Sequence, residues 1–411
     1  MSRFVVAVVL LAGCAAQAKP PVVAPPPPPP AAPPVPPAAR LPAGVRPLAY
    51  TLELTIDPKA ERFSGRTQIA MQIDVATDFV WLHGRDLHVT SARAIAGSES
   101  IAATYTQAND DGVSQLRFAK PLPTGNGVVF ELVYDAPFDH QLKGLYRVDT
   151  DGEAYAFTQF EPLSARLAFP SFDEPGFKTP FDVWLTVPSS DKAFSNTPAL
   201  AEEVVAEGWK RVHFAQTKPL PTYLVAFAVG PLDVVEAAAI PPNAQRTTPL
   251  PLRGIAVKGR GKQLQHVLGE TGTTLAALER YFGSAYPYEK LDIVAVPDFA
   301  AGAMENAGFV TFREWLLFVD AAHASEGQRR ASTYVMAHEL AHQWVGDLVT
   351  MQYWEDLWLN EAFATWLGER VVGELHPEFK APLSALESTH GAMWADGHMS
   401  ARMIRQPITS T

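Results

Sequence analysis

The sequence predicts a multi-domain protein in which an antiparallel β sandwich or saddle is followed by an α+β domain. The chain has 411 residues, which is long enough for two or three domains. Short segments of alternating polar and apolar residues, separated by turn residues, fill much of its first half. Helical periodicity dominates after Ser325. An apolar fraction of 47% and a charged fraction of 19% are ordinary for a globular protein.

Residues 1–18 predict a lipoprotein-type signal peptide. A short basic start precedes the apolar stretch Phe4–Ala12, which is too short to span a membrane. The stretch leads into Leu-Ala-Gly-Cys14, which resembles the lipobox of bacterial lipoproteins, where cleavage precedes the cysteine and its thiol receives a lipid. An ordinary signal peptide cut after Ala18 is the alternative. Because Cys14 is the only cysteine of the chain, its position favours lipidation.

Either signal predicts export to the bacterial cell envelope. If Cys14 is lipidated, we expect a periplasmic or outer-membrane protein that is held to the membrane only by this anchor. Residues 19–44 follow as a linker rich in proline and alanine, with 13 of the 36 prolines between Pro20 and Pro42. This composition predicts a stiff polyproline spacer, and a disordered tail without a role is the alternative.

We expect residues 45–236 to form the β domain and residues 237–411 to form the α+β domain. Period-two alternation marks strands at 50–56 and 67–73 in the first, and Leu291–Val296 is a buried strand in the second. Helices are expected at 263–282, 326–345 and 360–374. Ser325 and Gln328 have the spacing of a capping box, and Gly346 is a plausible end for that helix.

The central helix carries a metal-binding pattern. His338 and His342 are four residues apart, so both imidazoles face the same side of a helix and can reach one ion at about 2.0–2.1 Å. Glu339 projects beside them, where a water would occupy the open coordination position. Glu361, at the start of the next helix, supplies a third ligand and leaves one position free. The sequence therefore predicts one Zn²⁺ held by His338, His342 and Glu361.

The charge balance argues against one function class. The formal net charge is −11, which gives no electrostatic support to nucleic-acid binding.

Four motifs resemble the gluzincin aminopeptidases typified by aminopeptidase N. That family joins HExxH, across 18 intervening residues, to a glutamate inside the run WLNEGFA, and residues 358–364 read WLNEAFA, with Ala362 in place of Gly. Residues 302–306 (GAMEN) match the exopeptidase signature of the family. Residues 158–161 (TQFE) and 168–175 (AFPSFDEP) match another block, with Ser171 where Cys is common. The resemblance extends from about Leu41 to Thr411 and implies a thermolysin-like catalytic domain.

The resemblance also implies a role for each matched residue. Peptides would lose their N-terminal amino acid, with Glu339 activating the water at the metal. Glu305, helped by Glu161, would bind the free α-ammonium by charge-assisted hydrogen bonds. Gln159 would lie near the first side-chain pocket, and the main chain of Gly302 and Ala303 would line the substrate.

Neighbouring residues have two open interpretations. Asn360 and Asp347 either orient the imidazoles or are caps and solvated groups. The aromatic residues near the third ligand are interpreted as core packing rather than as a substrate platform; they are Tyr353, Trp354, Trp358, Phe363 and Trp366.

One element of the family pattern is not found. The family stabilises the oxyanion with a tyrosine well beyond the third ligand, whereas the last tyrosine here is Tyr353. The sequence therefore predicts a catalytic domain truncated at its C-terminus. Two alternatives stay open: a catalytically silent peptide-binding fragment, and an epoxide hydrolase like the leukotriene-hydrolysing relative, which usually has Gly at the position of Ala303.

Overall fold

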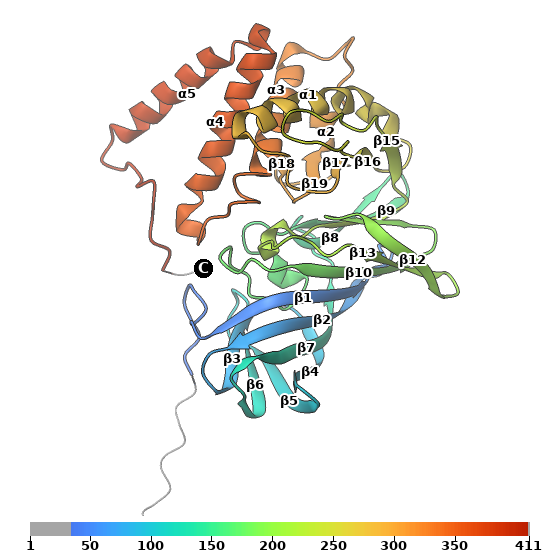
Figure 1. Ribbon diagram of the computed structural model, residues 1–411, viewed down its shortest axis with the longest axis vertical. Helices are drawn as coiled ribbons and strands as arrows, with labels where there is room; N and C mark the ends of the chain where they lie inside the picture. Colours follow the sequence, from blue (N-terminus) through green and yellow to red (C-terminus); the bar gives the residue numbers. More distant parts are fainter. Residues whose placement is uncertain (1–33, 410–411) are drawn as a thin grey trace, which may run out of the picture. The chain divides into compact units, whose positions relative to one another are not determined.

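The computed structural model describes residues 34–409 (Figure 1). The predicted signal peptide, Cys14 and residues 19–33 of the predicted linker lie outside this range, so these predictions stay predictions. Among the described residues, no helix combines the length and the apolar character that crossing a bilayer requires.

The β-rich half is built around one large sheet. Strand β1 (Val45–Thr55) illustrates how the strands of this sheet contribute to the core. Its buried residues alternate with partly exposed ones, so Tyr50, Leu52 and Leu54 enter the core while Glu53 faces outward. The ten strands, in their order across the sheet, are β12 (Ala199–Ala206), β13 (Trp209–Phe214), β10 (Phe181–Pro188), β1, β2 (Arg62–Ile73), β7 (Gly125–Pro137), β4 (His88–Ala96), β5 (Glu99–Gln107), β6 (Val113–Leu122) and β3 (Thr77–His83).

The pairing in this sheet departs from the prediction at one place. Strands β1 and β10 run parallel, with Tyr50 opposite Phe181, whereas the other described neighbours are antiparallel. A parallel neighbour cannot be joined by a short hairpin, so β10 reaches β1 only after a long excursion of the chain. The excursion contains two of the four strands of a second, smaller sheet.

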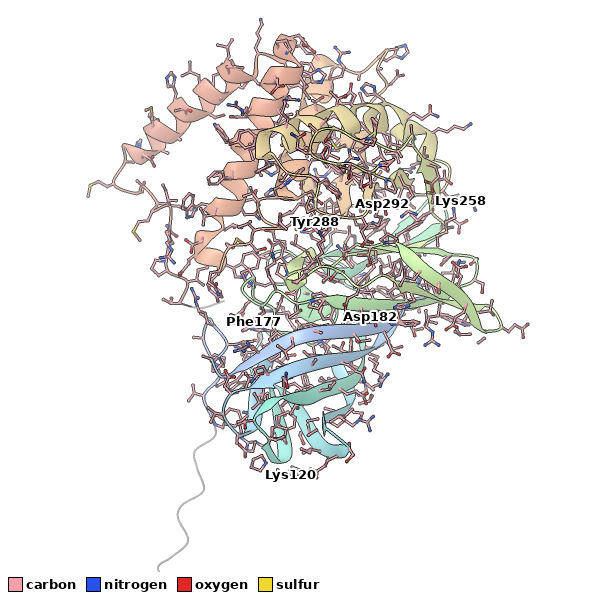
Figure 2. All side chains as sticks on the ribbon, in the orientation of Figure 1. Lys120, Phe177, Asp182, Lys258, Tyr288 and Asp292 are labelled. Atoms are coloured by element: carbon pink, nitrogen blue, oxygen red, sulfur yellow. The ribbon has the colours of Figure 1, made fainter. Side chains whose placement is uncertain are left out.

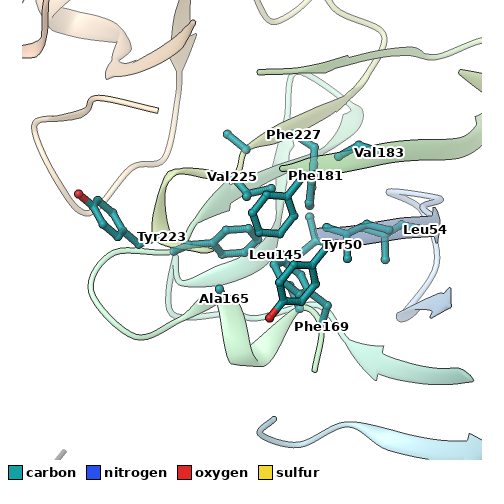
Figure 3. Packing of buried hydrophobic residues seen from close by; sticks show 14 of the residues in the cluster. Tyr50, Leu54, Leu145, Ala165, Phe169, Phe181, Val183, Tyr223, Val225 and Phe227 are labelled. Atoms are coloured by element: carbon teal, nitrogen blue, oxygen red, sulfur yellow. The ribbon is translucent and has the colours of Figure 1, made fainter. Parts of the chain in front are cut away.

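The smaller sheet delivers two candidate substrate-binding residues. Its four strands are β11 (Lys192–Ser195), β14 (Phe227–Gly230), β9 (Glu153–Gln159) and β8 (Gly144–Thr150), in this order and all antiparallel. Gln159 is the last residue of β9, and Glu161 follows it. Figure 3 shows Tyr50, Phe169, Phe181 and Phe227 within one cluster of buried side chains. Phe160, directly after β9, packs edge-on against Phe169 and Phe227, which holds the end of β9 against the core.

The second half contains a five-stranded sheet and the helices. The strands are, in order, β15 (Asp233–Glu236), β16 (Leu252–Ala256), β17 (Leu291–Val296), β19 (Phe309–Arg313) and β18 (Ala303–Met304). Strand β15 lies before residue 237 but pairs with β16, so this sheet begins a few residues upstream of the predicted domain boundary. The helices are α1 (Gln265–Phe282), α2 (Glu314–Leu317), α3 (Glu326–His342), α4 (Trp358–Leu375) and α5 (Ala381–Asp396). The order of a β-rich part followed by an α+β part is as predicted.

Strand β17 is buried on both faces. Ile293 joins the apolar cluster of the helices, while Val294 joins the cluster of the β-rich half. A near-continuous apolar run is expected for a strand with parallel neighbours and two covered faces. The one acidic residue of the strand, Asp292 (labelled in Figure 2), is fully buried and pairs with Arg253 and Lys290, each at 2.8 Å. Burial, partly offset by Asp292, lowers the pKa of Lys290 to about 8.

The helix boundaries confirm the start of α3 and correct its end. The Ser325 hydroxyl accepts a hydrogen bond from the Gln328 N–H at 3.1 Å, as a capping box requires. The Gln328 side chain does not reach back, because it donates to the carbonyls of Trp315 and Phe318. The helix was expected to reach Val345 but ends at His342. The N–H groups of Gln343 and Trp344 bond three residues back, which tightens the last turn.

Candidate active site

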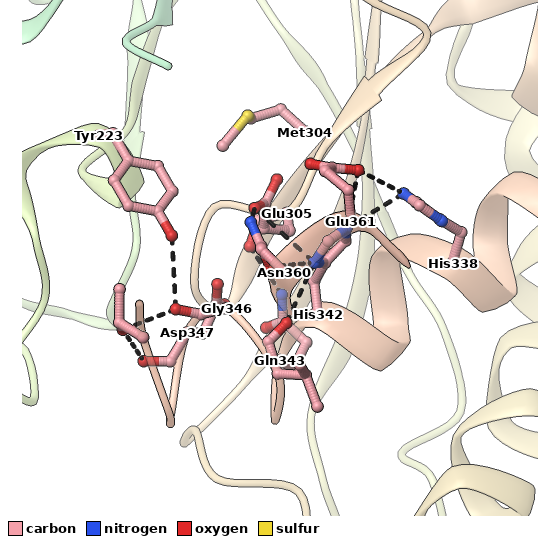
Figure 4. Close-up of polar contacts among 12 residues, drawn as sticks. Tyr223, Met304, Glu305, His338, His342, Gln343, Gly346, Asp347, Asn360 and Glu361 are labelled. Carbon is pink, nitrogen blue, oxygen red and sulfur yellow. Dashed lines mark hydrogen bonds and ion pairs between the residues drawn. The ribbon is translucent and has the colours of Figure 1, made fainter. Parts of the chain in front are cut away.

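Helix α3 places the two histidines as the spacing predicts. The rings of His338 and His342 converge, and their Nε2 atoms are 3.0 Å apart (Figure 4). His342 is buried and His338 is partly exposed. Two imidazole nitrogens this close are well placed for one shared cation.

Glu361 of α4 completes a three-ligand cluster. Its Oε2 lies 3.5 Å from His338 Nε2 and 3.8 Å from His342 Nε2. Tetrahedral bonds of about 2.0–2.1 Å place neighbouring ligand atoms roughly 3.3–3.4 Å apart. The three separations, 3.0, 3.5 and 3.8 Å, lie on both sides of this value, so the three residues could hold one metal ion. Burial alone would raise the pKa of Glu361, but the two histidines lower it below its ordinary value.

Asn360 orients the inner histidine. His342 Nδ1 lies 2.7 Å from Asn360 Oδ1 and 3.1 Å from the Val345 carbonyl, so both partners of Nδ1 are acceptors. With Nδ1 donating, Nε2 is left with its lone pair toward the cluster, as a metal ligand requires. The Asn360 amide also donates to Glu305 Oε1 at 3.1 Å. One side chain therefore links the histidine to the carboxylate.

Gly346 makes this arrangement possible. Its φ is +120°, a backbone conformation that L side chains rarely adopt. A Cβ atom built there would lie 2.1 Å from Asn360 Oδ1 and 3.2 Å from His342 Nδ1. A side chain at this position would thus displace the amide that orients His342.

Four carboxylates from both halves of the protein meet at the cluster. Ligand atoms of Glu161, Glu305 and Glu361 lie within 4.8 Å of one another, as do those of Glu305, Glu339 and His342. Burial and the neighbouring carboxylates raise the pKa of Glu161 and of Glu339. Glu339 Oε2 is buried without a hydrogen-bond partner among the described residues. So much buried negative charge is costly unless cations enter the site.

Gln159 and the Gly302–Ala303 segment flank the carboxylates. The Gln159 amide is buried and points at Met304, with Nε2 3.5 Å from the sulfur. Its Oε1 has no partner among the described residues. Strand β18, which contains Ala303, is the edge of the five-stranded sheet. An unpaired edge can pair with an extended peptide.

Asp347 does not contact the imidazoles. Both of its carboxylate oxygens are buried and lack a partner among the described residues. Burial, then the charge of Glu305, raises its pKa. Its backbone N–H bonds to the His342 carbonyl at 3.0 Å, and Lys178 donates to its carbonyl at 2.7 Å. Of the two candidate orienters, the geometry thus supports only Asn360.

The aromatic interpretation was right for two residues of five. Tyr353 and Trp354 are buried, but Trp358, Phe363 and Trp366 on α4 are 39–46% exposed. Successive residues of a helix are distributed around its axis with a period of 3.6, so an aromatic-rich helical segment need not lie wholly in the core.

Sequence reasoning missed Gln343 and Tyr223. Gln343 is fully buried and donates to the Glu305 carbonyl at 2.7 Å. It follows Glu339 by four residues, so helical spacing could have placed it on the same side as the candidate base. Tyr223, from the β-rich half, directs its hydroxyl at the Gly346 carbonyl at 3.4 Å (Figure 4). No local pattern in the sequence points to this contact.

The fold and this cluster define a two-part protein with a candidate metal centre of the HExxH type. Comparison with known families matches residues 46–224 to the peptidase M1 N-terminal domain and residues 266–411 to the peptidase family M1 domain. Together the two ranges cover most of the chain. The chain therefore belongs to peptidase family M1.

Several curated relatives carry aminopeptidase names. The chain is 36% identical over 374 residues to Aminopeptidase M1-B of Oryza sativa subsp. japonica, covering 90% of the chain and 42% of that relative. It is 37% identical over 367 residues to Aminopeptidase M1 of Arabidopsis thaliana, covering 87% and 41%. It is 32% identical over 378 residues to Endoplasmic reticulum aminopeptidase 1 of Rattus norvegicus, covering 90% and 40%. The chain thus spans about two-fifths of the length of these relatives.

Proposed function

We propose that this protein is a zinc-dependent aminopeptidase, which removes the N-terminal amino acid from peptides. The observation that carries the proposal is the shared position of Glu305. It lies 3.9 Å from the inner histidine of the metal cluster and within 4.8 Å of two further carboxylates, Glu161 and Glu361. A place for a metal ion and a place for an ammonium group thus adjoin each other. The aminopeptidase names of the relatives support the same activity.

In this proposal His338, His342 and Glu361 hold the zinc ion. Two imidazoles and one carboxylate are a common ligand set of catalytic zinc, which leaves a further position open. When bound, zinc supplies Lewis acidity toward the scissile carbonyl and toward a water molecule. The fit of the three ligand separations to a tetrahedral site supports this assignment.

Glu339 is the proposed general base. It is one residue from His338 on α3, and its Oε2 is buried and unpartnered among the described residues. A carboxylate that is enclosed and not engaged elsewhere can take a proton from water and later transfer it to the leaving amine. Glu339 is not counted among the ligands because His338, His342 and Glu361 already supply the two imidazoles and the carboxylate of the proposed ligand set.

Glu305 and Glu161 are the proposed partners of the substrate's α-ammonium. Glu305 is buried and Glu161 is partly buried, and burial, followed by the charge of Glu305, raises the pKa of Glu161. An ammonium group would relieve the repulsion between the two carboxylates and form charge-assisted hydrogen bonds. Cutting at the first peptide bond then follows, because the amine and the metal are held a fixed distance apart.

Two flanking elements would hold the rest of the substrate. We assign the main chain of Gly302 and Ala303, at the β18 edge, to pairing with an extended peptide. We assign Gln159 to the first side-chain pocket, because its buried Oε1 lacks a partner among the described residues.

The test compares free and blocked amines. We expect the zinc-loaded protein to hydrolyse an aminoacyl anilide and not the same anilide after N-acetylation. Glu305→Gln should lower kcat/KM for the free substrate by a factor on the order of 10²–10³ and leave zinc content unchanged. Measured kcat/KM values for both substrates check this. Equal cleavage of the acetylated and free anilides would exclude the exopeptidase proposal.

A further inference from the structure

Gln343 links the metal-binding helix to the loop that carries Glu305. Its side chain, which is 0% exposed, forms three hydrogen bonds. Nε2 donates to the Glu305 carbonyl at 2.7 Å. Oε1 accepts from the Gly308 N–H at 3.1 Å and from the Tyr286 hydroxyl at 3.2 Å. The amide therefore uses its donor on one side of the 305–308 turn and its acceptor on the other.

The hydrogen bond from Gln343 holds the backbone of Glu305, whereas Asn360 holds the Glu305 carboxylate. Asn360 belongs to α4 and donates to Glu305 Oε1 at 3.1 Å. Gln343 lies at the end of α3, directly after His342, and holds the Glu305 carbonyl. The residue proposed to bind the amine is thus fixed at two points, one for each helix that supplies metal ligands.

We propose that Gln343 is a positioning residue that sets the distance between Glu305 and the metal ligands. This inference rests on the proposed function. The distance decides where the α-ammonium lies relative to the scissile carbonyl, and therefore which bond of the peptide is cut. A displacement of about 1 Å in such a site typically costs on the order of 10²-fold in rate.

The 305–308 turn has other attachments, so it should shift rather than unfold when Gln343 is changed. Lys290 Nζ donates to the Gly308 carbonyl at 2.8 Å. Asn196, from the β-rich half, donates to the Ala307 carbonyl at 3.0 Å. Only Gln343 bonds to the main chain of Glu305 among the described side chains. Its loss should therefore move the carboxylate more than the rest of the turn.

The shape of an amide explains why glutamine suits this position. A buried carbonyl and a buried N–H face the same side chain, so the side chain must offer a donor and an acceptor at once. Ionised glutamate keeps the acceptor for Gly308 and Tyr286 and lacks the donor for Glu305. Methionine has a similar length, no donor at any pH, and only a weakly accepting sulfur. The two substitutions thus separate the Glu305 contact from the other two.

The experiment measures binding of a free amine as well as activity. Calorimetry on the zinc-loaded full chain gives the affinity for L-leucine and for N-acetyl-L-leucine, and metal analysis gives the zinc content. We expect Gln343→Glu to weaken L-leucine binding by 10-fold or more, with unchanged zinc content and a higher KM for the free aminoacyl anilide. Gln343→Met should weaken L-leucine binding to a similar extent, and it replaces Gln343→Glu in the experiment if the charged variant does not fold.

Asn196→Asp is the matched control. It is the same change from amide to acid, in a buried residue that holds the same turn at Ala307 and makes no contact with Glu305. We expect it to retain most of the parent's L-leucine binding, because its hydrogen bond holds the turn at Ala307 and not at Glu305.

Two results would overturn the proposal. One is a Gln343 variant that binds L-leucine as the parent does, and the other is equal weakening in the Asn196→Asp control. Loss of zinc in the Gln343 variants would also contradict it, because the residue would then act through the metal. If the parent itself fails to prefer L-leucine over its acetylated form, the proposed function fails, which is a separate outcome.

Discussion

At the scale of single residues, the candidate site depends on side chains that share partners. Asn360 touches both His342 and Glu305, and Gly346 leaves the space that Asn360 occupies. A substitution at any of these positions should therefore alter the positions of the other side chains. Effects of substitutions here should be coupled rather than additive, because the residues lie in one hydrogen-bond network.

The metal ligands give the most direct residue-scale prediction. We expect about one zinc ion per chain in the parent protein and loss of most of it in His338→Ala and in Glu361→Ala, because each removes one ligand of three. Metal analysis of the purified proteins checks this. His323→Ala is the control, since His323 is exposed and pairs with Asp320 away from the cluster. Undiminished zinc in both ligand variants would refute the assignment.

At the scale of elements, the site exists because α3 and α4 pack closely. Gly368 of α4 faces His338, and a Cβ atom there would lie 3.2 Å from the His338 backbone nitrogen. This close approach brings Glu361 to the two histidines, which are already one turn apart on α3. Two ligands thus follow from one helix, and the third follows from how a second helix packs against it.

The segment 39–41 connects the two halves at another point. The Leu41 N–H donates to Glu174 Oε1 at 2.5 Å, and the Tyr353 hydroxyl donates to the Ala39 carbonyl at 2.9 Å. Arg40 stacks 4.0 Å above the Tyr353 ring and pairs with Glu355 at 3.0 Å. Burial raises the pKa of Glu174 to about 7, although the Leu41 N–H and the charges of Arg40 and Arg166 oppose the rise.

A pH dependence of stability follows from Glu174. Its pKa is about 7 in the folded protein and near the ordinary 4.5 in the unfolded chain. The folded state therefore binds this proton more tightly, and its stabilising effect is lost as the pH rises from about 4.5 to about 7. Glu174→Gln should remove this slope, with a difference from the parent of up to about 3 kcal/mol over that range.

Thermal unfolding of both metal-loaded proteins at several pH values between 4.5 and 8 measures the effect. Other titrating groups cancel in the difference between parent and variant. Parallel stability curves for the two proteins would show that Glu174 does not titrate in this range.

At the scale of the whole molecule, the two halves share a core as well as a site. The apolar cluster of the β-rich half includes Val294 and Phe309 from the second sheet, and Tyr353 from the segment before α4. Glu161 and Gln159 come from the β-rich half, whereas Glu305 and the metal ligands come from the other. A core shared by both halves fixes the positions of these groups, so the carboxylates proposed to bind the amine keep a constant distance from the proposed metal ligands.

Export and lipidation remain a prediction for the whole molecule, since Cys14 lies outside the described residues. In a bacterial host, we expect Cys14→Ala to move the protein from the detergent-extracted membrane fraction to the soluble fraction, because one acyl-bearing thiol would be lost. Labelling with a palmitate analogue should disappear in the same variant. Unaltered fractionation together with an unlabelled parent would favour the ordinary signal peptide.

The sequence by itself determined the features that depend on neighbours along the chain. Period-two alternation located β1 and β2, a continuous apolar run located β17, and the i, i+4 spacing placed His338 and His342 on one face of α3. The motif after HExxH pointed to Glu361. Each of these is local, because strand and helix periodicity decide which way a side chain faces.

Only the tertiary structure decided what each face meets. It brought Glu161 from the end of β9 to Glu305, set Gln343 against the Glu305 carbonyl, and left Trp358 and Trp366 exposed. The parallel pairing of β1 with β10 and the early end of α3 were likewise decided only by the tertiary structure. Periodicity specifies a direction but not a partner, and partners distant in the chain are chosen by packing between elements.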